Sequence, residues 1–143
     1  MSIGFRLVAD PDVTEYRQFA IVSQAYTIGD SVDISRTAAD VVPSTSSSVT
    51  YGIRGVAMET VTSAATTLLV ALSTPRQRWT ADVTNTPVAT DNGQRMVLTD
   101  VRTVNNTHTD STTSSAVFEQ LGVQDATGKR IVGRFLNASN VTA

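Results

Sequence analysis

Residues 66–83, with the sequence TTLLVALSTPRQRWTADV, decide the fold class. The first eight residues form a continuous apolar run whose leucines also keep a helical spacing, so periodicity alone leaves both helix and strand open. Two threonines and a valine in the run are β-branched and fit a strand better than a helix. Pro75 would end either element. We therefore predict a buried strand over residues 66–73.

The second half of this stretch alternates in a way typical of a half-buried strand. One face would carry Gln77, Trp79, Ala81 and Val83, and the other Arg76, Arg78, Thr80 and Asp82. Two interpretations of the single tryptophan stay open. Trp79 packs in the core with the arginines outside, or Trp79 joins Arg76 and Arg78 in gripping a partner, because Trp and Arg are enriched at interface hot spots.

Outward from this stretch, strand-like segments recur between turn residues. Residues 18–26 and 31–35 flank Gly29 and Asp30 and are predicted to form a hairpin. Residues 49–59 resume the strand pattern, and Gly52 and Gly55 within them suggest either a bulge or a close backbone approach. We expect a polar loop over residues 42–50.

The C-terminal half shows the same succession of strand-like segments and turn residues. Asn92-Gly93 precedes an apolar segment and predicts a second hairpin. A polar loop is expected over residues 105–115, followed by strands over 116–123 and 130–135 with a turn between them. The regular spacing and the abundance of threonine and valine predict an all-β fold, a sandwich or a small barrel, in one domain.

Composition excludes several classes of protein. The 143 residues contain no cysteine, which excludes disulfide frameworks and thiolate metal sites. A formal net charge of −2 is unlike that of domains that bind phosphate backbones. The longest apolar run, near residues 68–72, is far shorter than a bilayer span of ~20 residues. We expect neither nucleic acid nor a membrane as partner, and the first residues lack the pattern of a secretion signal.

Candidate catalytic groups are sparse. His108 is the single histidine, and Asp110 follows on the same polar segment, where sequence neighbours seldom form a triad. The carboxylates are scattered, without the spacing of a calcium loop or a paired-acid site. No phosphate-binding glycine motif is present. We expect no enzyme activity, no cofactor and no metal.

Arginine strongly outnumbers lysine, since Lys129 is the only lysine among 11 basic residues. Guanidinium groups make bidentate contacts that suit ion pairs shielded between chains. Arg76 and Arg78 beside Trp79 could also stack on nucleic-acid bases, but one such group in an acidic chain is weak support. The arginine excess favours an assembly protein.

Five quoted segments together resemble the small phage proteins that decorate and cement tailed-virus capsids. They are TIGDSVDI, YGIRGVAMETV, TTLLVALSTPRQRWTADVTNTP, DNGQRMVLTD and GKRIVGRFL. The resemblance implies a β-barrel or β-tulip core over residues 18–143, with an arm over residues 1–17 that could instead be a first strand. It also implies trimers bound to the major capsid protein on the outer surface of the virion.

Carried over to this chain, the resemblance makes Ile3, Phe5 and Arg6 part of an arm that lies on the capsid or on a neighbouring copy. With Arg76, Arg78 and Trp79 they form the expected interface. The expected function is capsid cementing. A tail-tube or head-completion protein, and a glycan-binding β-sandwich with an exposed aromatic platform, are the alternatives.

Overall fold

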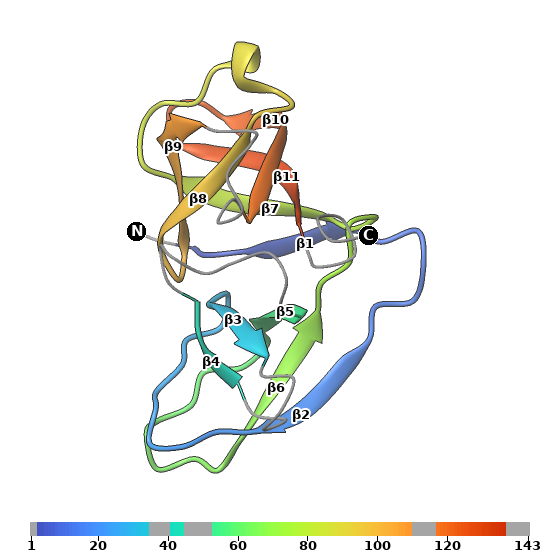
Figure 1. Cartoon of the computed structure of the whole chain (residues 1–143), viewed down its shortest axis with the longest axis vertical. Coiled ribbons are helices and arrows are strands. Elements are labelled where there is room, and N and C mark those ends of the chain that lie inside the picture. The colour runs from blue at the N-terminus through green and yellow to red at the C-terminus, as the bar shows by residue number, and fades with distance from the viewer. Residues whose placement is uncertain (1–2, 35–40, 45–52, 110–116, 137–143) are drawn as a thin grey trace.

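The computed structural model describes residues 3–34, 41–44, 53–109 and 117–136, and these fold almost entirely into strands. They form a barrel and a second, five-stranded sheet, at the top and bottom of Figure 1. The barrel contains β7 (Arg78–Val83), β8 (Arg95–Asp100), β9 (Thr103–Thr109), β10 (Phe118–Asp125) and β11 (Arg130–Phe135). The five-stranded sheet contains β2 (Tyr16–Ala20), β3 (Ser31–Ile34), β4 (Val41–Pro43), β5 (Ile53–Ala57) and β6 (Thr67–Leu72).

The barrel closes through a parallel pair. Its antiparallel order runs β7-β11-β10-β8-β9, and β9 returns to β7 with Asp82 opposite Thr103 and Val83 opposite Val104. Closure leaves no open edge within the ring, which is how small all-β bodies avoid unpaired strands. β1 (Arg6–Ala9) adds to β7 from outside the ring. The prediction of an all-β fold with a small barrel is confirmed.

Aromatic side chains fill the barrel core. Trp79 and Phe118 are fully buried, and both contact Phe135 edge-on, with ring centroids 5.7 and 5.1 Å from it. Phe5, from before β1, completes the cluster at 4.7 Å from Phe135. Offset and edge-to-face rings at such distances stabilise beyond the area they bury. The alternation predicted for β7 therefore places Trp79 inward.

The five-stranded sheet has the order β2-β6-β5-β3-β4 and its own apolar cluster. Val56 and Ala71 from this sheet instead join the barrel core, so the two sheets pack as parts of one domain. A Cβ at Gly55 would lie 2.7 Å from the carbonyl oxygen of Ala71. The predicted strand over residues 66–73 is confirmed. Of the two alternatives for Gly55 the structure shows the close approach, and Gly52 lies outside the described residues.

The first predicted hairpin is wrong. β2 ends at Ala20 and pairs with β6, while β3 pairs with β4 and β5. Gly29 does adopt a positive φ of 96°, but the turn serves a long-range contact, because its carbonyl accepts a hydrogen bond from the Phe5 N–H at 3.0 Å. The turn at Gly29 was therefore predicted correctly, but the pairing of the strands on either side of it was not.

The second predicted hairpin is also wrong. Asn92 follows a short 3-10 helix, Ala89–Asp91, and has a φ of −60°, whereas a two-residue type I′ turn needs positive φ at both positions. The hairpin in this region lies one strand later, where residues 101–102 join β8 to β9. The predicted strand–turn–strand at the C-terminal end is confirmed as β10 and β11.

Both predicted polar loops begin as strands. β4 occupies Val41–Pro43, and β9 extends through residues 103–109. The rest of these two segments, residues 45–50 and 110–115, lies outside the described part of the chain.

Candidate interaction surface

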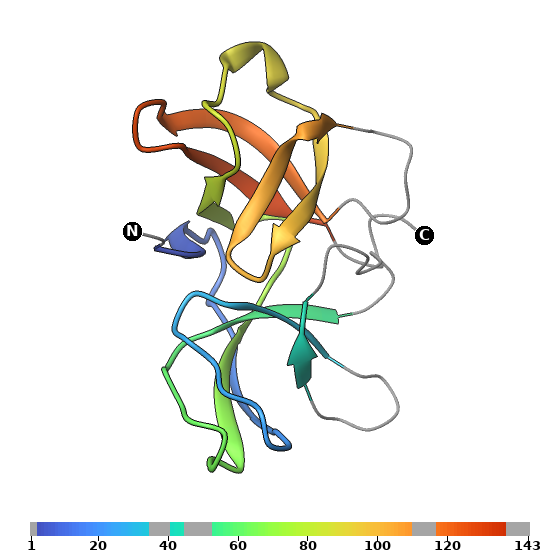
Figure 2. The ribbon, with the colours of Figure 1, turned by 90° about the vertical axis from the view of Figure 1, so that its left-hand side faces the viewer.

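The N-terminal strand lies between the barrel and the five-stranded sheet, as Figures 1 and 2 both show. β1 pairs with β7, with Arg6 opposite Thr80 and Leu7 opposite Trp79. On the other side, the hydrogen bond from Phe5 to Gly29 ties the same segment to the five-stranded sheet. Of the two alternatives for the N-terminal segment, the structure shows an ordered strand at Arg6–Ala9.

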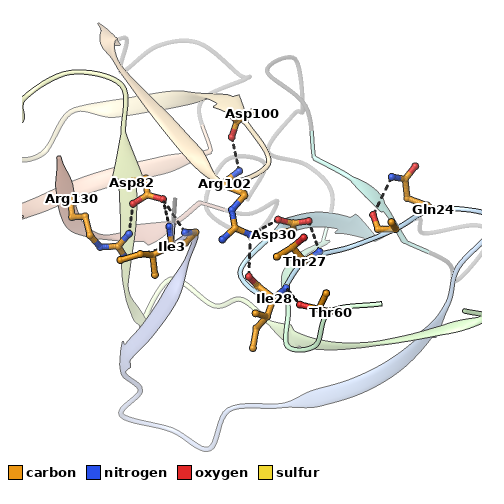
Figure 3. Close-up of polar contacts among 12 residues, drawn as sticks. Ile3, Gln24, Thr27, Ile28, Asp30, Thr60, Asp82, Asp100, Arg102 and Arg130 are labelled. Carbon is orange, nitrogen blue, oxygen red and sulfur yellow. Dashed lines mark hydrogen bonds and ion pairs between the residues drawn. The ribbon is translucent and has the colours of Figure 1, made fainter. Parts of the chain in front are cut away.

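A buried charged group fixes the start of this strand. One carboxylate oxygen of Asp82 accepts the backbone N–H groups of Ile3 and Gly4, each at 2.9 Å (Figure 3). The other oxygen pairs with Arg130, whose guanidinium also donates to the Gly4 carbonyl at 3.2 Å and to the Thr80 hydroxyl at 2.6 Å. This ion pair is shielded from solvent, and both of its side chains hydrogen-bond to the backbone of residues 3 and 4. It therefore fixes the backbone at the start of the strand as well as the two side chains.

A second arginine links the barrel to the neighbouring loop. Arg102, in the turn between β8 and β9, donates to the Asp30 carboxylate at 2.7 Å and to the Ile28 carbonyl at 3.1 Å (Figure 3). The Asp30 carboxylate also accepts the Thr27 N–H at 2.9 Å. The junction is thus fixed by hydrogen bonds as well as by the shared core.

Four of the six predicted interface residues line one cavity of about 280 Å³ at this junction. They are Ile3, Phe5, Arg6 and Trp79. Ile3 is 39% exposed and Arg6 is exposed, so both are available at the surface. Phe5 and Trp79 are 2% and 0% exposed, because they form part of the barrel core. The prediction that these two rings contact a partner is corrected accordingly.

The other two predicted residues lie apart from the cavity, where the chain crosses from β6 to β7. Arg76 is exposed and stands 3.5 Å from the Asp12 carboxylate. Arg78 is exposed too, and its guanidinium contacts the carbonyl oxygens of the turn before it. Both arginines face solvent, as the alternation predicted.

Gln77 ties this crossing to the link between β1 and β2. Its buried amide accepts the Trp79 indole N–H at 3.0 Å and donates to the Asp10 carboxylate at 3.1 Å. Hydrogen bonds from the Thr14 hydroxyl and then from the Asp12 N–H hold the pKa of Asp10 below its ordinary value. The chain is therefore anchored on both sides of β1.

Sequence reasoning missed an exposed strip that begins in β1 and continues beyond β2. Val8, Val13, Tyr16 and Val22 are 57%, 95%, 49% and 77% exposed. All β2 side chains are exposed except that of Phe19, which is half-buried, so neither face of this strand is well covered. β2 is exposed on both faces at the end of its sheet, and no local sequence signal distinguishes such a strand from one that is half-buried.

The chemical candidates of the sequence add nothing to this surface. The backbone of His108 lies in β9, but its side chain and Asp110 lie outside the described residues. Within the described ranges, no group of three or more His, Cys, Asp or Glu side chains could hold a metal ion. In the same ranges, no helix is long and apolar enough to cross a bilayer.

Comparison with protein-family models and with curated protein sequences finds no match to this chain. The resemblance to capsid decoration proteins therefore stays a prediction from the sequence.

Proposed function

We propose that this protein is a structural component of a tailed-virus particle that binds the outer surface of the assembled capsid and cements neighbouring major capsid proteins. The observation that carries the proposal is an exposed surface at the junction of barrel and sheet, here called the waist. It consists of Ile3, Arg6 and Ile28, which are exposed and line the cavity described above.

The waist combines features that favour attachment to a protein lattice. Two of its residues are apolar, and Ile3 and Ile28, 39% and 51% exposed, line the same cavity as the charged Arg6. Its backbone is held by Asp82 and Gly29, so binding would order few additional groups and lose little conformational entropy. Arginine and apolar groups on a rigid support are what a stable interface needs at its centre.

Cementing requires no reaction, only preferential binding to the assembled shell. A protein that binds the assembled state alone stabilises it by about 2.7 kcal/mol per site when its free concentration is 100 times Kd. Many copies on one shell multiply this effect.

The test uses capsids purified without this protein. We expect the wild-type chain to co-sediment with them and to raise the temperature at which they rupture. Ile28→Asp places a charge in the waist and should abolish both effects, while Val88→Asp alters an apolar residue of similar exposure, 49% against 51%, on the loop before the 3-10 helix and should leave them intact. Failure of the wild-type chain to bind, or an unchanged rupture temperature, would refute the proposal.

A tail-tube or head-completion protein is the second candidate, favoured by the outer edge of β2, which pairs with no other strand among the described residues. Such a protein forms rings or tubes on its own, which electron microscopy of the purified chain would reveal. The glycan-binding alternative required an exposed aromatic platform, and the fully buried Trp79 does not supply one.

A further inference from the structure

The loop between β7 and β8 contains the single Asn-Gly pair of the sequence, Asn92-Gly93. The pair follows the short 3-10 helix at the top of the barrel in Figure 1, and both residues are exposed. Asparagine loses its side-chain amide most readily before glycine, because glycine has no side chain to shield its nitrogen. The pair is therefore reactive toward water unless its conformation prevents the reaction.

Deamidation begins within the dipeptide. The Gly93 nitrogen gives up its proton and bonds to the side-chain carbon Cγ of Asn92, while the bond from Cγ to Nδ2 breaks and ammonia leaves. Water then opens the resulting cyclic imide at one of its two carbonyl carbons and gives aspartate or isoaspartate at position 92. The first step requires a Gly93 N–H that is free to lose its proton and a nitrogen that faces Cγ.

The fold withholds both requirements. The Gly93 N–H donates to the Gln120 carbonyl at 2.7 Å, and the ψ of Asn92, 131°, turns the Gly93 nitrogen away from the asparagine side chain. The N–H groups of Asp91, Asn92 and Gln94 also donate to carbonyls of the same loop, at 3.2, 3.1 and 2.9 Å. Rotation into the reactive conformation would break the hydrogen bond from Gly93 to Gln120.

The side chain of Gln120 holds the asparagine side chain as well. Its Nε2 donates to the Val88 carbonyl at 2.8 Å and to the Oδ1 of Asn92 at 3.0 Å. A carbonyl oxygen only accepts, so the contact with Val88 fixes which end of the Gln120 amide points to the loop. Gln120 is fully buried, and its Oε1 has no hydrogen-bond partner among the described residues. This buried amide thus places its donors on the loop and leaves its acceptor unpaired.

We propose that Asn92 is a deamidation site that stays intact while its loop is docked on β10, and that Gln120 is the positioning residue. The backbone carbonyl of Gln120 retains the proton of Gly93, and its side-chain amide holds the Asn92 carbonyl. Isoaspartate at position 92 would insert a carbon atom into the main chain and add a negative charge, so the Gly93 N–H would lose its place opposite Gln120. The modification would therefore mark chains whose barrel has opened. The inference concerns the purified chain and is independent of capsid binding.

Mass spectrometry of the peptide that contains residue 92 tests the protection. The wild-type chain is incubated at mildly alkaline pH, folded in buffer or unfolded in guanidinium chloride, and isoaspartate is detected by enzymatic methylation. Opening the loop breaks at least two hydrogen bonds, so we expect deamidation to be roughly 10- to 100-fold slower in the folded chain. Asn92→Asp has no side-chain amide at this position and serves as the control for peptide assignment. Equal rates in the folded and unfolded chain would overturn the proposal.

Gln120→Met tests the positioning residue. Methionine has a similar length and keeps the backbone carbonyl but lacks the amide donor, so the folded-state rate should rise by roughly 2- to 10-fold, the factor for one lost hydrogen bond. The rate in guanidinium chloride should equal that of the wild type. Val70→Ala is the control for lost stability, because it truncates a fully buried residue of β6, in the other sheet, and should leave the folded-state rate unchanged.

Two results would contradict the role of Gln120. A Gln120→Met rate at or below that of the wild type would mean that the amide activates the Asn92 carbonyl toward attack. An equal rise in Val70→Ala would mean that deamidation proceeds through unfolding of the whole domain. If Gln120→Met does not fold, the comparison of folded and unfolded wild type still decides whether the fold protects Asn92.

Discussion

Phe5→Ala tests whether the start of the chain belongs to the core. The ring is 2% exposed, and its centroid lies 4.7 Å from that of Phe135 and 5.5 Å from that of Phe118. Truncating a buried phenylalanine removes its transfer free energy and leaves a cavity, at a combined cost of about 3–5 kcal/mol. Whole domains have unfolding free energies of only about 5–15 kcal/mol, so this loss would be a large fraction of the total.

The assay is equilibrium unfolding in urea, followed by the fluorescence of Trp79, the only tryptophan. Val13→Ala is the control, because that residue belongs to the same N-terminal segment but is 95% exposed. It should change the unfolding free energy by less than about 0.5 kcal/mol. If Phe5→Ala also cost less than about 1 kcal/mol, the segment would be a free arm and the packing described above would be incorrect.

Three further substitutions test the framework around this segment. Asp82→Asn leaves the buried guanidinium of Arg130 without its carboxylate and should cost about 3–5 kcal/mol in urea unfolding; a loss below about 1 kcal/mol would contradict the buried pair. Gly133→Ala would place a Cβ 2.2 Å from the Glu119 carbonyl oxygen and should cost at least about 1–3 kcal/mol, measured by thermal unfolding; an unchanged Tm would refute the close packing of β10 on β11. Because the folded-state pKa of Asp10 is lowered, its carboxylate contributes stability above its ordinary pKa that is lost as pH falls through the lowered value. Asp10→Asn should therefore flatten the dependence of unfolding free energy on pH below about pH 4, and an unchanged acid limb would contradict this.

Local patterns predicted the strands well. The β-branched apolar run gave β6, and the alternation after it placed Trp79 inward and Arg78 outward. Both predictions depend on properties of a single segment, namely rotamer preference and the two-residue period of a strand.

Pairing between segments could not be predicted in the same way. Gly29 and Asn92 were read as hairpin turns, but the partners of the adjoining strands lie elsewhere in the chain. The barrel closes through a parallel contact between β7 and β9, and no local turn signal marks such a pair.

At the candidate site, too, local features could be predicted and contacts between distant segments could not. Exposure of Arg76 and Arg78 followed from the alternation predicted for residues 76–83, whereas Arg6 was expected at the surface only through the resemblance. Phe5 was expected in an arm because of the resemblance to capsid decoration proteins, and only the three-dimensional cluster with Phe135 shows that it is buried. Asp82 stood on the predicted outer face, and nothing in the sequence indicated that it would bind the backbone of residues 3 and 4.

A cryo-electron microscopy map of the virus particle that contains this chain tests the central claim most directly. We predict that density for the barrel and the five-stranded sheet lies on the outside of the shell, with the waist facing the major capsid protein. Density for this fold in the tail tube, inside the shell or nowhere on the particle would contradict the proposal.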